Sequence, residues 1–135
     1  MKVTGKILEE KFDEYNRLYF NNNLIKPKFS TYTSENSMGC FNVSEKKNKF
    51  KKTISIIRNV NFMEKDFRDI LVHEMIHLYV YDTYGKGHSH DEFFNRKMKE
   101  LNKSYGLDIR KKSNHLFRKY FPKISFLRKI KNLII

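Results

Sequence analysis

The stretch Ile70-Leu71-Val72-His73-Glu74-Met75-Ile76-His77-Leu78-Tyr79-Val80-Tyr81 combines an apolar run with two histidines and a glutamate. Residues four apart lie on one face of a helix, so His73 and His77 present two imidazoles to one point in space. Two imidazoles with a carboxylate beside the first, in the pattern HExxH, are typical of catalytic zinc: two ligands and a base next to the metal. The flanking apolar residues indicate that this helix is buried and its ligands held still. The sequence therefore predicts a buried helix that carries two metal ligands, called the metal helix below.

The composition is that of one globular domain with a basic last third. The 135 residues have 39% hydrophobic and 15% aromatic side chains and a net charge of +13. Residues 86–135 carry 14 Lys and Arg against 4 Asp and Glu, whereas residues 1–85 carry 14 against 11. This distribution favours an anionic partner for the last third, nucleic acid first and a membrane surface second; a well-solvated Lys-rich surface is the alternative.

The sequence also predicts an intracellular location, either cytoplasmic or DNA-associated. No segment reaches the roughly 20 apolar residues of a transmembrane helix, and the charged start predicts no signal peptide. Cys40 is the only cysteine, which excludes internal disulfides and fits a reducing compartment. We expect Cys40 to be a small buried hydrophobic residue.

The periodicity of the apolar residues predicts an α+β fold. Helical spacing indicates a first helix over residues 6–20, capped by Thr4. Three strands are predicted in a small, mainly antiparallel sheet, at residues 29–32, 38–43 and 53–57, with residues 44–52 as a mobile hairpin loop. The HExxH helix follows and ends at Gly85. A further helix, which Ser89 would cap, and more carboxy-terminal helices complete the chain.

The third metal ligand is not fixed by spacing alone. A catalytic zinc takes three protein ligands and keeps a fourth position for water. Val80 and Thr83 stand where metzincins have glycine and a third histidine, which excludes that class. The downstream candidates are Glu92, Glu100, His88 and His90. The histidines are favoured, because a tight loop after Gly85 can bring either one back over the same metal.

The residues after this loop carry a resemblance to a known family. His90-Asp91-Glu92-Phe93-Phe94 and Met98 follow His77 after twelve residues. The pattern resembles the SprT/Spartan family of zinc metalloproteases, in which HEMxH is followed by a Gly-rich loop and His-x-x-x-Phe/Trp, often with Met four residues on. Weaker matches follow the family's order, and the resemblance covers roughly residues 7–105. These matches are Tyr15–Phe20, Leu24–Pro27, Met38–Cys40 and Ile54–Ile56.

The resemblance implies a zincin-like fold and one Zn²⁺ ion. Its ligands would be His73, His77 and His90, with His88 in reserve, because only from His90 does the four-residue step reach Phe94. Glu74 would take a proton from the attacking water and pass it to the leaving amine. We expect Phe94 and Met98 to be core residues.

The implied function is a zinc-dependent endopeptidase that cleaves proteins bound or crosslinked to DNA, single-stranded DNA included. With one cysteine the chain cannot build the zinc ribbon of many relatives, so we expect a minimal, monomeric enzyme. Residues 1–108 would form the metalloprotease domain, and residues 109–135 a basic, amphipathic, helical tail. The alternative is a non-catalytic nucleic-acid-binding module with a structural zinc.

The tail allows three interpretations. Its apolar stripe consists of Ile124, Phe126, Leu127, Ile130, Leu133 and Ile134. The stripe docks onto the domain's own core, or the tail contacts nucleic acid, or it lies on a membrane surface. The basic residues for a nucleic-acid contact are Arg110, Lys111, Lys112, Arg118 and Lys119. We expect His115, in the same region, to be solvated and not a ligand.

Overall fold

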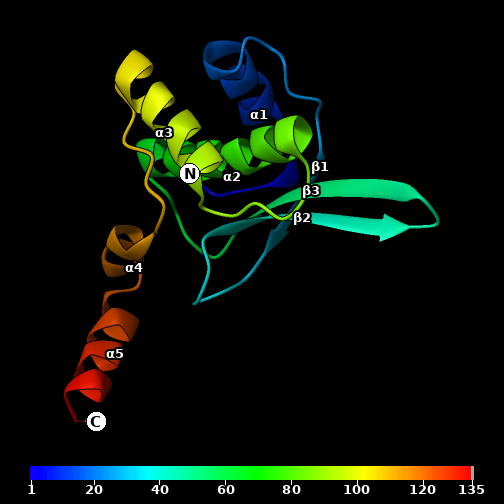
Figure 1. Ribbon diagram of the computed structural model, residues 1–135. Coiled ribbons are helices and arrows are strands. Elements are labelled where there is room, and N and C mark those ends of the chain that lie inside the picture. The colour runs from blue at the N-terminus through cyan, green and yellow to red at the C-terminus, as the bar shows by residue number, and fades with distance from the viewer. Residues whose placement is uncertain (135) are drawn as a thin grey trace.

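The computed structural model describes residues 1–134 and has the α+β architecture that the sequence predicts. Its elements are α1 (Gly5–Tyr19), β1 (Lys28–Tyr32), β2 (Gly39–Lys46), β3 (Lys49–Ile57), α2 (Glu64–Tyr84), α3 (Glu92–Tyr105), α4 (Asn114–Tyr120) and α5 (Pro122–Ile134). Figure 1 shows α1 and α3 on one side of α2 and the sheet on the other. Among the described residues, no helix is long and apolar enough to cross a membrane. The side chain of Ile134 and residue Ile135, both in the predicted tail, lie outside the described residues.

The helix α2 is the centre of the fold. Most positions from Phe67 to Val80 are buried, because the sheet covers one side and α1 and α3 cover another. A helix that is apolar on most sides fits such a position. It ends where predicted, at Gly85, whose φ of 88° is accessible to glycine. The predicted cap of α1 is also confirmed, since Thr4 Oγ1 accepts a hydrogen bond from the Ile7 amide at 3.1 Å.

The sheet has the strand order β1-β3-β2, with β3 in the middle. The longer pairing, between β2 and β3, is antiparallel, and the shorter one, between β1 and β3, is parallel. Strand β2 therefore lies at an edge, next to α2. At Gly39 a Cβ atom would lie 3.1 Å from the Ser55 carbonyl oxygen and 3.3 Å from Ile70 Cγ2. The absence of a side chain at Gly39 thus lets this edge strand pass close over the metal helix.

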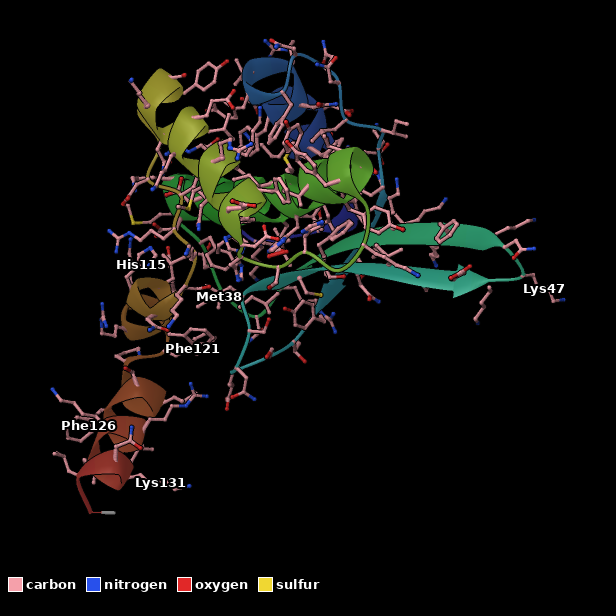
Figure 2. The ribbon with its side chains drawn as sticks, in the orientation of Figure 1. Met38, Lys47, His115, Phe121, Phe126 and Lys131 are labelled. Atoms are coloured by element: carbon pink, nitrogen blue, oxygen red, sulfur yellow. The ribbon has the colours of Figure 1, made fainter. Side chains whose placement is uncertain are left out.

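The far end of β2 and β3 forms a protruding hairpin with Lys47 at its tip (Figure 2). Lys47 and Asn48 have φ values of 50° and 63°, and Lys46 pairs with Lys49 across them. Two left-handed residues in a two-residue loop match a type I′ turn. The prediction of a mobile loop over residues 44–52 is therefore wrong. Backbone pairing continues through this stretch. Its side chains are exposed on both faces, so the sequence lacks the alternation of apolar and polar residues that indicates a strand.

The helix α4 is anchored to the start of α2. Its Leu116 side chain is 3% exposed. The Tyr120 hydroxyl donates a hydrogen bond to Asp66 and accepts one from the Met63 amide. Lys119 Nζ lies 2.6 Å from Asp66 Oδ2. These contacts fix the chain as far as Tyr120, close to the metal helix.

The helix α5 leaves this anchor and runs away from the domain (Figure 1). A hydrogen bond of 2.6 Å joins Arg128 Nη2 to Asn36 Oδ1 of the domain, but the side chains of Phe126, Leu127 and Leu133 are exposed. The interpretation that the stripe of α5 docks onto the domain's own core is therefore wrong for Phe126, Leu127 and Leu133; Ile124 and Ile130 of the same stripe are half-buried. The division of the chain after residue 108 stays a prediction.

Candidate metal centre

Three histidines converge at one point beside the sheet. His73 and His77 come from successive turns of α2, and His90 from the loop that leads into α3. The Nε2 atom of His90 lies 3.1 Å from Nε2 of His77 and 3.1 Å from Nε2 of His73. One possible ligand atom from each of His73, His77 and His90 lies within 4.8 Å of the other two, so the three residues form a group that could hold a metal ion. Among the described residues, neither Glu92, Glu100 nor His88 belongs to this group.

The spacing and protonation of the three imidazoles fit a divalent metal ion. A tetrahedral zinc with Zn–N distances of about 2.0–2.1 Å places its ligand nitrogens about 3.3 Å apart, close to the observed 3.1 Å. Burial lowers the pKa of His73 to about 4, and burial together with the neighbouring imidazoles lowers that of His77 to about 3. The pKa of His90 is also lowered, first by burial and then by the Lys111 charge. All three rings are thus neutral near pH 7, the form that binds metal.

A backbone carbonyl fixes the tautomer of His73. Its Nδ1 atom lies 2.8 Å from the carbonyl oxygen of Arg110. Because a carbonyl oxygen only accepts, Nδ1 carries the hydrogen and Nε2 keeps its lone pair, which points to His90. Sequence analysis missed this role of Arg110, since a backbone carbonyl has no residue-type signature.

Asp91 organises the loop that carries His90. One carboxylate oxygen of Asp91 caps α3 by accepting from the Phe93 amide at 3.1 Å. The other lies 2.6 Å from His88 Nδ1. Asp91, and not the predicted Ser89, is therefore the cap of α3. His88 is engaged with Asp91, while its neighbour His90 faces α2.

Phe94 forms the floor beneath the three histidines. Its side chain is fully buried. The ring centroid lies 4.9 Å from that of His73, 4.7 Å from that of His77 and 4.8 Å from that of His90. The expectation that Phe94 is a core residue is confirmed, and it has the added feature of contact with all three imidazoles.

Glu74 carries a buried oxygen with no partner. Its side chain is only 7% exposed, and within the described residues Oε2 has no hydrogen-bond partner. Oε1 lies 3.8 Å from Nε2 of His73. Burial raises the pKa of Glu74 to about 8. A buried carboxylate oxygen without a protein partner, beside three neutral imidazoles, fits a site that receives a cation and water.

A cleft of about 460 Å³ opens over Glu74 and the histidines. Gly39, Cys40 and Phe41 of the edge strand β2 line one part of it, and the segment before α4 lines another. Cys40 is exposed to this cleft. The expectation that Cys40 is buried is therefore wrong, because its position in the strand faces away from the core.

The structure separates the five basic residues predicted to contact nucleic acid. The cleft is lined by Arg110, Lys111 and Lys112. Lys119 is instead paired with Asp66 in the anchor of α4, and Arg118 is exposed on α4 outside the cleft lining. His115, expected to be solvated, is half-buried at the cleft and lies outside the histidine group.

The helix with its paired histidines, the adjacent three-stranded sheet and the third histidine from the following loop define a zincin-like class of metalloprotease fold. The family follows from comparison with known proteins. The chain matches the model of the SprT-like family over residues 8–115 and belongs to that family. No curated protein matches the chain.

Proposed function

We propose that this protein is a zinc-dependent endopeptidase that cleaves proteins bound or crosslinked to DNA. One observation carries the enzymatic part. Three neutral imidazoles, with Nε2 of His90 3.1 Å from Nε2 of both His73 and His77, lie beside a buried, partnerless oxygen of Glu74 at the base of an open cleft. Membership of the SprT-like family, whose proteins are generally metallopeptidase-like, supports the same reaction. In this proposal residues 1–108 are the metalloprotease domain and residues 109–135 the basic tail.

The residues of the site divide into metal ligands, a base and a group that orients one ligand. His73, His77 and His90 would hold one Zn²⁺ ion through Nε2. When bound, zinc would supply a Lewis acid that polarises a peptide carbonyl and makes water more acidic. A cation held by the three histidines would favour the ionised form of Glu74. In that form Glu74 accepts a proton from water in the cleft and delivers it to the nitrogen of the leaving amine. The Arg110 carbonyl keeps His73 in the tautomer that ligation needs.

The edge strand β2 offers a means of positioning a peptide. Its residues Gly39 to Phe41 line the cleft, and within the described residues only β3 pairs with it. An extended peptide can add to such an edge through backbone hydrogen bonds, which recognise any sequence. This arrangement suits an endopeptidase with broad substrate choice.

The DNA part of the proposal has separate support. Lys111 and Lys112 are exposed and line the same cleft as the histidines. Exposed cations beside the cleavage site would place a DNA backbone near the protein to be cut. The resemblance to the Spartan proteases favours such a substrate, and single-stranded DNA is the first form to test.

The test is cleavage of a DNA-bound basic protein by the zinc-loaded full chain, with and without single-stranded DNA. Glu74→Gln should retain zinc and lose turnover, whereas the matched control Glu92→Gln, at an exposed position on α3, should cleave normally. His73→Ala and His77→Ala should lose stoichiometric zinc. Full activity of Glu74→Gln would refute its role as base. Cleavage that DNA does not stimulate would refute the DNA-linked substrate and leave the peptidase.

A nucleic-acid-binding module with a structural zinc is the alternative. Three histidines beneath an open cleft favour the catalytic form, since structural zinc sites are closed by four protein ligands. Titration with a hydroxamate chelator distinguishes the two. A ternary complex with the zinc-loaded protein would support an open coordination position, and the absence of binding would support a closed, structural site.

A further inference from the structure

The helix α5 has an apolar face of which three large side chains are exposed. The side chains of Phe126, Leu127 and Leu133 are 63%, 63% and 79% exposed. Together with the half-buried Ile130, they stand at positions i, i+1, i+4 and i+7, which a helix places on one face. Exposed large hydrophobic side chains gathered on one helix face mark an interaction surface.

Basic side chains lie opposite this face and along its edges, and Lys123 lies on it in the first turn. Arg128, Lys129 and Lys131 fall at helical angles outside the Phe126 face. In Figure 2, Phe126 and Lys131 lie on different sides of α5. No Asp or Glu occurs in residues 109–135, which carry nine Lys and Arg. The helix is therefore amphipathic, and all of its charged side chains are cationic.

The anchoring of the tail leaves the apolar face free. The contacts of Tyr120 and Lys119 with Asp66 fix α4. The side of α5 that reaches the domain is the one that carries Arg128, which bonds Asn36. Since Arg128 lies far around the helix from the apolar residues, that face is turned away from the domain.

Charge and side-chain type together identify the partner. We propose that α5 binds an anionic lipid bilayer, with its apolar face at the acyl boundary and its lysines among the headgroups. A nucleic acid would use the cations but offers little to the aliphatic side chains Leu127, Ile130 and Leu133. A second copy of the chain would bring like charges together over a helix of 13 residues, too short for a typical stable dimer interface of about 800 Å² per partner.

Fluorescence gives a direct test because the chain has no Trp. Leu127→Trp in the full, zinc-loaded chain should show a blue shift of its emission with vesicles of phosphatidylcholine and phosphatidylserine. Ile25→Trp, at a 75% exposed position in the domain, should show none. In vesicle sedimentation, vesicles of phosphatidylcholine alone should bind at least about tenfold less protein than the anionic vesicles, because the electrostatic attraction of each basic residue to the bilayer is lost.

Variants separate the two contributions. Phe126→Ser with Leu133→Ser, and separately Lys129→Gln with Lys131→Gln, should each reduce binding to the anionic vesicles about tenfold or more. Both pairs are exposed, so the fold and hydrolysis of a soluble peptide should be unchanged. This separates failure of the membrane proposal from failure of the proposed function. No vesicle binding, or full binding by the serine variant, would overturn the proposal. So would tail-dependent DNA binding or self-association in the absence of vesicle binding.

Discussion

Phe94 should contribute to zinc affinity and not only to stability. Its ring lies within 4.9 Å of each of the three imidazole centroids, so it restricts all three ligands at once. Phe94→Leu keeps an apolar side chain but removes the aromatic ring that contacts the imidazoles. Groups that orient metal ligands typically contribute about 10- to 100-fold to metal affinity. We therefore expect this variant to bind zinc at least about tenfold more weakly.

The effect can be expressed as a change in the stabilisation that zinc provides. At a free zinc concentration 100 times the wild-type Kd, zinc raises the free energy of unfolding by about 2.7 kcal/mol. A site that binds tenfold more weakly gains only about 1.4 kcal/mol at the same concentration. The loss of packing in Phe94→Leu destabilises the protein both with and without zinc, so it cancels in this difference.

The assay is urea unfolding of the wild-type protein and the variant, each at this zinc concentration and with chelator. Phe12→Leu is the matched control. Phe12 is 1% exposed and packs against Phe29 at a centroid distance of 5.4 Å, away from the histidines. It should lower stability while leaving the zinc-dependent increment at about 2.7 kcal/mol. Equal zinc-dependent increments in Phe94→Leu and Phe12→Leu would refute the reasoning and leave Phe94 as an ordinary core residue.

Metal analysis of purified His90→Ala should find loss of stoichiometric zinc, whereas His88→Ala should retain it; the opposite result would reverse the ligand assignment. Burial acts to raise the pKa of Asp66, but hydrogen bonds from α4 outweigh it and the pKa is lowered. The lowered pKa of Asp66 in the folded protein stabilises the fold above about pH 4, and this stabilisation is lost as the pH falls further. The free energy of unfolding should therefore decrease more for the wild-type protein than for Asp66→Asn between about pH 5 and 3. Equal losses in urea titrations would exclude this linkage. Replacing Lys47-Asn48 by Asn-Gly should raise the unfolding free energy by about 0.5–1 kcal/mol, and a decrease would contradict the type I′ turn.

Sequence predicts the metal helix well because its signal is local. The spacing of His73 and His77 follows from helical geometry alone, and the apolar residues between Ile70 and Val80 fit its buried position. The convergence of His90 with them was also expected, from the register of His90 and Phe94 in the family pattern. Each of these features depends on residue type and spacing.

The rest of the site depends on features that residue types do not encode. The carbonyl of Arg110 bonds His73 across 37 positions of the chain, and any residue at 110 would offer the same oxygen. The hairpin beyond Val43 is held by backbone pairing without a buried face, so its charged side chains predict a loop. The exposure of Cys40 follows from which face of β2 is turned away from the core, and that depends on how the sheet packs and not on the strand itself.

The stripes of α3 and α5 show why a pattern identifies a face but not its partner. Phe94, Met98 and Leu101 on α3 have the same helical spacing as the apolar residues of α5, yet Phe94 and Leu101 are buried and Phe126 is exposed. The difference lies in the anchors. Asp91 caps α3 and sets it against α2, whereas the anchor of α4 on α2 directs α5 away from the domain. The partner of a buried stripe is the element that covers it. The partner of an exposed stripe has to be inferred from the residues around it, and in α5 the basic residues beside and opposite the stripe favour an anionic surface.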